Sequence, residues 1–167
     1  TAQPPAPVDK RETIMRAAID VFAERGYFNA QVADIARVAG VAAGTVYLYF
    51  RSKDDLLVSI FEKTMKQRLA EGKAAVANVV EPAERLRQFA HLHLGMLGRD
   101  RNLAIVFQVE LRQSVKFMER FSSTLLRDYL GQIRAAIEDG QARGTFRRDI
   151  NATTGAKMFF GALDEMA

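Results

Sequence analysis

The sequence QVADIARVAGVAAGTVYLYF, residues Gln31–Phe50, is typical of two short helices joined at a glycine. Each segment has one apolar face, formed by Ile35, Ala36 and Ala39 in the first and by Val46, Tyr49 and Phe50 in the second. Gly40 can take the left-handed backbone conformation that ends a helix, and Val41 is expected to fill the corner after it. This spacing predicts a helix-turn-helix, whose second helix is presented to the major groove of DNA.

Composition places the chain among ordinary globular proteins. It has 167 residues, of which 49% are hydrophobic and 26% charged. The absence of cysteine excludes disulfides and thiolate metal sites, which suits a cytoplasmic protein. The sequence has no apolar run of about 18 residues and no signal-peptide pattern, so we expect a cytoplasmic protein without a membrane span.

Charge gives only local evidence for a nucleic-acid partner. The net charge is +4, yet residues 1–60 hold seven basic and seven acidic side chains, so the excess lies in the remainder (17 − 13 = +4). Within the motif, Arg37, Arg51 and Lys53 bracket the second helix, and Asp34 is the single acid between positions 32 and 53. The helix-turn-helix pattern, and not overall basicity, therefore predicts DNA binding.

The rest of the chain divides into three parts. Residues 1–8 contain three of the four prolines and are expected to form a disordered arm. Residues 9–68 form the predicted DNA-binding domain, and residues 69–167 form a C-terminal domain reached by a long connector helix over 52–77. No segment alternates with period two, so the predicted fold is all-α. Because the apolar pattern reaches Ala167 without a stop signal, we expect a last helix to be missing.

The N-terminal residues resemble the TetR family of transcriptional regulators. The resemblance rests on GVAAGTVYLYFRSKDDL, Gly40–Leu56, preceded by the segments Ala18–Gly26 and Ile35–Ala36. It implies an all-helical homodimer with a three-helix DNA-binding domain and a C-terminal domain for ligand binding and dimerisation. No cofactor is implied, and the expected partner is double-stranded operator DNA.

A second block gives a narrower resemblance. The segments NLAIVFQVELRQS, Asn102–Ser114, and FGALDE, Phe160–Glu165, are similar to the fatty-acid-degradation regulators of this family, often called FadR. That resemblance implies a repressor that binds long-chain acyl-CoA and then releases DNA. The alternative is a repressor of an efflux or detoxification operon that responds to another hydrophobic small molecule.

The expected DNA contacts follow from the family positions. Tyr47, Tyr49 and Lys53 match positions that contact phosphates, Thr45 has a hydroxyl for the same purpose, and Gln31 is placed to donate to a phosphate. Ala42, Ala43 and Gly44 bring the backbone near the groove, where Ala43 can touch a thymine methyl. Because Ala42 and Ala43 replace the polar residues usual in the family, the operator sequence is not predicted. Each tyrosine has a core alternative, which is stronger for Tyr49 beside Val46 and Phe50.

The expected ligand site is in the C-terminal domain. Its apolar lining, which would equally serve as an ordinary core, consists of Phe89, Leu97, Ile105, Phe107, Leu111, Phe121 and Leu125. Arg112 follows Leu111 in a mostly apolar segment, where a cation needs an acid or an anionic ligand. Two readings stay open: an ion pair with Glu110, Glu119 or Asp164, or a contact to the phosphates of coenzyme A. Arg99 and Arg101, in a polar connection, are weaker candidates for the same contact.

Other functional classes find little support. The sequence has no GxSxG, P-loop, GxGxxG or HExxH motif and no cysteine nucleophile, so an enzyme is not expected. His91 and His93 lie two residues apart on different faces of one helix and do not form a metal pair. A helical adaptor would leave the surface from Thr45 to Tyr49 without a role.

Overall fold

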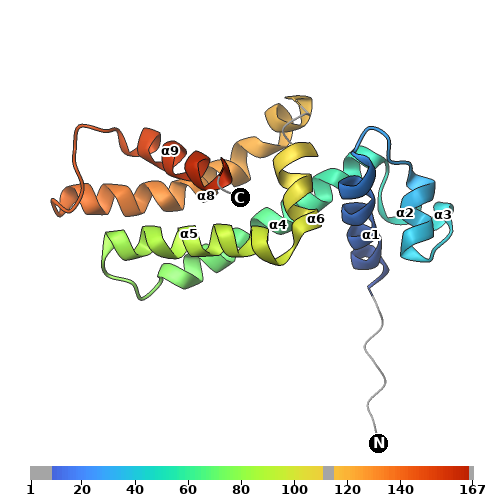
Figure 1. Ribbon diagram of the computed structural model, residues 1–167, viewed down its shortest axis with the longest axis horizontal. Coiled ribbons are helices and arrows are strands. Elements are labelled where there is room, and N and C mark those ends of the chain that lie inside the picture. Colours follow the sequence, from blue (N-terminus) through green and yellow to red (C-terminus); the bar gives the residue numbers. More distant parts are fainter. Residues whose placement is uncertain (1–8, 111–114, 166–167) are drawn as a thin grey trace, which may run out of the picture.

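The computed structural model describes residues 9–110 and 115–165, with the backbone alone for residues 97, 109, 110 and 115–123. Every regular element in these ranges is helical, which confirms the predicted all-α fold. Figure 1 shows an elongated molecule with α1, α2 and α3 at one end and α5, α8 and α9 at the other. No single helix in the described ranges is long and apolar enough to cross a membrane.

The small end is a three-helix domain formed by α1 (Lys10–Arg25), α2 (Val32–Ala39) and α3 (Ala43–Tyr49). Gly40 ends α2 with φ 68°, the left-handed conformation that the sequence predicts. The axes of α2 and α3 then diverge by 98°, within the range of helix-turn-helix motifs. Val46 and Phe50 are buried as expected, but Tyr49 is 42% exposed. The prediction that Tyr49 belongs to the apolar face of the second helix was therefore wrong, since Val46 and Phe50 form the buried face without it.

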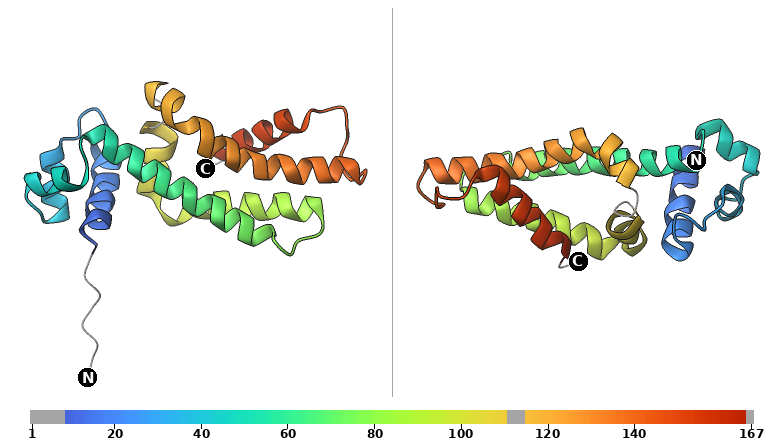
Figure 2. Two further views of the ribbon diagram at one scale, coloured as in Figure 1. Left: turned by 180° about the vertical axis from the view of Figure 1, so that it is seen from behind. Right: turned by 90° about the horizontal axis from the view of Figure 1, so that it is seen from above.

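Helix α4 (Lys53–Val76) joins the two ends of the molecule. Its first turn is capped by Ser52, which accepts a hydrogen bond from the backbone of Asp55, while Asp55 accepts one from the backbone of Arg51. The view from behind shows α4 running without a break from the small domain into the bundle (Figure 2, left). The predicted domain boundary at residue 68 falls inside this helix and stays a prediction.

At the large end α4 packs against α5 (Pro82–Arg99) and α8 (Val115–Ala142), and α9 (Ala152–Glu165) packs on α8 and α5. Pro82 occupies the first turn of α5, and Asn151 caps α9 by accepting from the backbone of Thr153. Gly72 lies where α4, α5 and α8 meet. A Cβ atom there would come within 2.5 Å of Gln132 Oε1 and 3.1 Å of a Phe89 ring carbon. Glycine therefore permits the close approach of these helices.

The segment from residue 101 to 110 is not one regular α-helix. Helix α6 (Arg101–Ile105) is short and passes into one π-helical turn, η1 (Val106–Glu110). The side chain of Asp100 caps α6 by accepting from the backbone N–H of Leu103, 3.1 Å away. The wider π turn brings Phe107 onto Phe61 of α4, with ring centroids 5.7 Å apart. Residues 111–113 lie outside the described ranges.

Candidate nucleic-acid interface and ligand-binding interior

The outer surface of α3 is the candidate DNA-reading surface. Ala42, Ala43 and Gly44 are exposed at its start, and Thr45 is half-buried. Three large side chains follow on the exposed side: Tyr47 at 56%, Leu48 at 83% and Tyr49 at 42%. The arrangement joins a thin backbone edge to two aromatic hydroxyls, and the groove approach and phosphate contacts stay predictions. Leu48 was not among the predicted contacts, although its place between two tyrosines put it on this side of the helix.

Lys53 has a different environment from the one that its predicted role requires. Its ammonium group donates to the carbonyl oxygens of Tyr27 at 2.6 Å and Ala30 at 3.0 Å, and lies 4.5 Å from the Tyr27 ring centroid. Burial lowers the pKa of Lys53. Here Lys53 fastens the loop between α1 and α2 to α4, and a phosphate contact would require it to exchange these partners.

The remaining candidates at this end are on α2. Gln31 stands at the N-cap position of α2, and its exposed side chain makes no capping hydrogen bond. Asp34 pairs with Arg25 at 2.8 Å and with Arg37 at 3.6 Å, and the Arg37 side chain remains 66% exposed. Gln31 and Arg37 thus have side chains available at the edge of the motif. Their contacts with DNA stay predictions.

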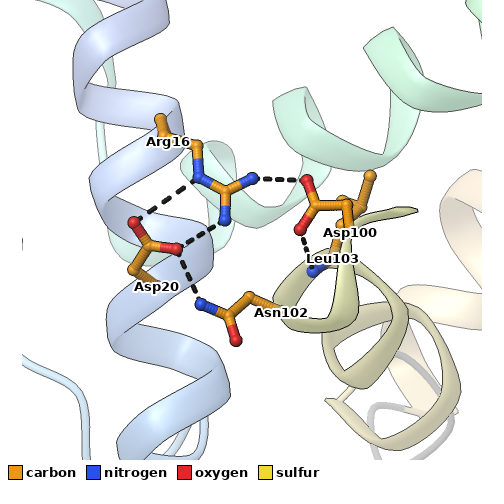
Figure 3. Close-up of polar contacts among 5 residues, drawn as sticks. All are labelled: Arg16, Asp20, Asp100, Asn102 and Leu103. Atoms are coloured by element: carbon orange, nitrogen blue, oxygen red, sulfur yellow. Dashed lines mark hydrogen bonds and ion pairs between the residues drawn. The ribbon is translucent and has the colours of Figure 1, made fainter. Parts of the chain in front are cut away.

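A polar cluster joins the two domains (Figure 3). Arg16 of α1 pairs with Asp20 of the same helix at 2.6 Å and with Asp100 at the corner between α5 and α6. Asn102 donates to the same Asp20 carboxylate at 2.8 Å. Burial alone would raise the pKa of Asp20, but the hydrogen bonds from Arg16 and Asn102 lower it. We call these four residues, Arg16, Asp20, Asp100 and Asn102, the interdomain cluster. It ties α1 to the corner between α5 and α6 independently of α4.

The structure describes only some of the residues predicted to form the apolar lining of the ligand site. Phe89 is buried at 1%, and Phe107 stacks on Phe61. Ile105 and Leu125 are half-buried. The Leu97 and Phe121 side chains, together with all of Leu111 and Arg112, lie outside what the structure describes. The role predicted for Arg112 therefore stays a prediction.

The bundle also encloses polar side chains that the sequence analysis missed. Arg68 of α4 is only 8% exposed, and within the described residues it forms no ion pair with a carboxylate. Its Nε atom lies 2.9 Å from Met96 Sδ, and it is also hydrogen-bonded with the Tyr129 side chain. Burial lowers the pKa of Arg68, with a smaller opposing effect from Tyr129. The signal was present in the spacing Leu57, Phe61, Met65, Arg68, Gly72, which puts a cation on the buried stripe of α4.

His93 is the second such group. It is 4% exposed, and neither ring nitrogen has a hydrogen-bond partner in the described part of the chain. Its Nε2 atom is 3.7 Å from an Asp164 carboxylate oxygen, and its ring meets Phe160 edge-on. Burial, and then the charge of Arg68, lowers the pKa of His93, so the ring is neutral near pH 7. His91 is exposed on the same helix, and the two do not form a metal pair; the described residues contain no cluster suited to a metal ion.

The fold and its surface define a helix-turn-helix protein whose helical bundle encloses two polar side chains, Arg68 and His93. Comparison with known proteins supports this class. Residues 14–60 match the family described as bacterial regulatory proteins, tetR family, and residues 61–167 match the C-terminal region of YsiA-like protein. The chain belongs to the TetR family of bacterial transcriptional regulators, which confirms the predicted resemblance.

Individual relatives are similar over both domains. The chain is 36% identical over 152 residues to the fatty acid metabolism regulator protein of Bacillus subtilis (strain 168), covering 91% of this chain and 78% of that protein. Its structure resembles the fatty acid degradation regulator FadR from Bacillus halodurans, with a TM-score of 0.88, 36% identity and coverage of 96% and 83%. A FadR from Bacillus subtilis in complex with stearoyl-CoA gives a TM-score of 0.86 at 35% identity, covering 92% and 83%.

Proposed function

We propose that this protein is a transcriptional repressor of fatty acid degradation genes that releases its operator when the C-terminal domain binds a long-chain acyl-CoA. The observation that carries the proposal is the likeness to FadR proteins across both domains, including one bound to stearoyl-CoA. The alternative, an efflux or detoxification repressor, is not favoured by these relatives. The described interior has the chemistry that an acyl-CoA requires. It combines apolar side chains such as Phe89 and Phe107, which suit an acyl chain, with buried polar groups.

Two structural connections would carry the response from ligand to DNA. The first is α4, which is continuous from the three-helix domain of α1, α2 and α3, here called the reading domain, to the bundle of α5, α8 and α9. The second is the interdomain cluster, together with the packing of α6 and η1 against α1. A ligand can shift the orientation of the reading domain only by binding one arrangement more tightly than the other. The ligand site must therefore differ between the two arrangements, as a site bounded by α4, α5 and α6 would.

The proposed active species is a homodimer. The face of α8 and α9 has a hollow of about 700 Å³. Its lining combines small and apolar residues, such as Leu130, Gly131, Ala135 and Ala156, with the charged Arg127, Asp128, Arg134 and Lys157. Small residues let the helices of a second copy approach closely, as in the dimers of this family. Two reading helices would then meet half-sites about 34–36 Å apart.

A mobility-shift assay on the protein's own upstream DNA tests the proposal. The full-length protein is expected to shift the fragment, and micromolar palmitoyl-CoA to dissociate the complex. Loss of the complex with an unrelated hydrophobic compound, but not with palmitoyl-CoA, would contradict the effector. Absence of any shift would contradict the repressor itself.

Tyr47 provides a sharper test of the DNA surface. Tyr47→Phe removes one exposed hydroxyl and leaves the ring, so it is expected to weaken operator binding without changing thermal stability. Tyr27→Phe is unsuitable as a control, because that hydroxyl bonds to Asp54. Phe28→Leu, on an exposed loop residue, is the better control and should leave operator affinity unchanged.

A further inference from the structure

A crevice of about 300 Å³ lies between α4, α5 and the start of α6. Arg68, Met96, Arg99, Asp100 and Leu103 are among its lining residues. Its volume is at the lower limit of small-molecule pockets, which span roughly 300–1,000 Å³. The crevice therefore has room for one polar group of a larger ligand and not for a whole acyl-CoA.

The buried guanidinium of Arg68 is the unusual feature of this crevice. It is 8% exposed, and the acceptors around it are neutral: the Met96 thioether and the Tyr129 side chain. A thioether is a weak acceptor, and a guanidinium has five N–H donors in a fixed fork. Glu71 acts on Arg68 only through its charge and forms no ion pair with it among the described residues. A buried cation without a directly bonded anion is costly, so this arrangement favours an anionic guest.

Arg99 supplies a second cation to the same crevice. Its Nε atom donates to the carbonyl of Gly95 at 2.8 Å, which folds the side chain back along α5. Its positive charge also lowers the pKa of Arg68, after burial as the larger cause. Arg99 itself forms no ion pair with any described residue.

Two carboxylates lie in the crevice as well, but both have other partners. Asp100 pairs with Arg16 in the interdomain cluster and accepts from the backbone of Leu103 at 3.1 Å. Glu71 is exposed at the rim and accepts from the side chain of Gln67 at 2.7 Å. The two arginines thus keep donor capacity that the carboxylates around them do not use.

We propose that this crevice holds a phosphate group of the acyl-CoA effector between the guanidinium groups of Arg68 and Arg99. The assignment rests on the proposed function, and it deepens it by placing the anionic end of the ligand. Arginine suits this role because its planar fork donates two parallel hydrogen bonds to phosphate oxygens. Asp100 and Leu103 border the crevice and also belong to the corner that meets α1, so the phosphate would sit beside the interdomain cluster.

The test compares two ligands that share an acyl-pantetheine part and differ in the phosphates and the adenosine. Titration of the full-length protein is performed with palmitoyl-CoA and with palmitoyl-pantetheine, which has no phosphate. The wild type is expected to prefer palmitoyl-CoA. Arg99→Gln is expected to weaken palmitoyl-CoA binding by about tenfold to a hundredfold, the loss of a charged hydrogen bond, while leaving palmitoyl-pantetheine unchanged. Arg87→Gln, at an exposed arginine of the same helix that does not line the crevice, is the matched control.

A variant of Arg68 separates ligand binding from scaffolding. Arg68→Met replaces the buried cation by an apolar chain of similar length. If Arg68 serves an absent anion, the ligand-free protein keeps or gains thermal stability while the preference for palmitoyl-CoA falls. If Arg68 is only a scaffold, the melting temperature falls and both ligands weaken together. Arg68→Lys, which retains the charge but not the fork, should recover part of the preference.

The outcomes distinguish the crevice from the effector. Equal binding of palmitoyl-CoA by the wild type and by Arg99→Gln and Arg68→Met would overturn the phosphate site while leaving the proposed effector in place. Failure of the wild type itself to bind palmitoyl-CoA would overturn the effector and the crevice assignment together.

Discussion

At the helix-turn-helix end, Ile14, Phe22, Ile35 and Leu56 are completely buried, whereas the bundle at the other end encloses Arg68 and His93. All the buried side-chain polar atoms found without a partner in the described residues, on His93 and Gln132, belong to the bundle. A fully apolar, close-packed core resists deformation, while unsatisfied polar groups leave free energy for a ligand to recover. The reading domain is thus built as a fixed body, and the bundle as a body that binding can change.

Removing an anchor of the reading domain should have the largest effect. Phe22→Ala deletes a completely buried ring that meets Tyr27 edge-on, and should lower the free energy of unfolding by about 3–5 kcal/mol. Denaturant unfolding measures it, and operator binding should be lost with it. Phe28→Ala, at a residue that is 67% exposed, should change stability by no more than about 0.5 kcal/mol. Equal losses in the two variants would contradict the rigid core.

A substitution in the turn between α2 and α3 should have the second-largest effect on stability. Gly40 has φ 68°, so Gly40→Ala forces a side chain into the left-handed region, at a cost of about 1–3 kcal/mol in urea unfolding. No neighbouring atom crowds the position, so any loss reports the backbone conformation alone. Gly44→Ala also adds an uncrowded methyl group, but at a helical φ, and is expected to leave stability unchanged or slightly raised. Similar losses at both glycines would contradict this explanation.

In the bundle, replacing a buried polar group should cost less. His93→Phe retains an aromatic ring beside Phe160 but is somewhat larger than the imidazole, so at pH 7 it should lower the free energy of unfolding by about 1 kcal/mol, the low end of the cost of overpacking. The pKa of His93 lies below its ordinary value of 6.5, so the unfolded chain binds a proton more readily than the folded one. Stability is therefore lost as the pH falls through 6.5 toward the lower folded-state pKa.

The pH dependence is the decisive part of that prediction. Between about pH 7 and pH 5 the wild type should lose more stability than His93→Phe, since the variant has no such proton to bind. His91→Phe changes the exposed histidine of the same helix and should keep the wild-type slope. An unaltered slope in His93→Phe would show that other groups produce the acid sensitivity.

The contact between the two ends should have the smallest effect on stability. The Arg16 and Asp100 side chains are 46% and 30% exposed, so a double-mutant cycle with Arg16→Gln and Asp100→Asn should give a coupling of about 0.2–1 kcal/mol. The coupling should fall as salt is added. A coupling of several kcal/mol would mean that the two ends form one cooperative core and would contradict the distinction drawn between them.

The sequence was most informative where local rules act. Gly40 predicted a left-handed turn, which depends only on neighbours in the chain, as do the cap at Ser52 and the helix start at Pro82. The resemblance to the TetR family extended the predictions to the residues on the outer surface of α3, whose contacts with DNA stay predictions. It did not reveal that the ammonium group of Lys53 is held by loop carbonyls of residues more than twenty positions earlier. Such a contact depends on tertiary placement, which periodicity does not report.

The ligand site shows the same limit more strongly. Arg68 was not among the predicted site residues, and its neighbours Lys66 and Gln67 are polar. Only the packing of α5 and α8 over that turn of α4 makes the arginine buried. The π turn at Val106–Glu110 escaped prediction for a related reason, since its residues follow an ordinary helical pattern.

The unbroken α4 also sets the scale of movement that an effector needs to produce. Its 24 residues span about 36 Å at 1.5 Å per residue. A tilt of about 5° at the bundle end displaces the other end of such a rod by about 3 Å, close to the 3.4 Å rise of one base along a DNA strand. A small angular change in the bundle is thus enough to move each half of a proposed dimer out of step with its half-site by nearly one base pair.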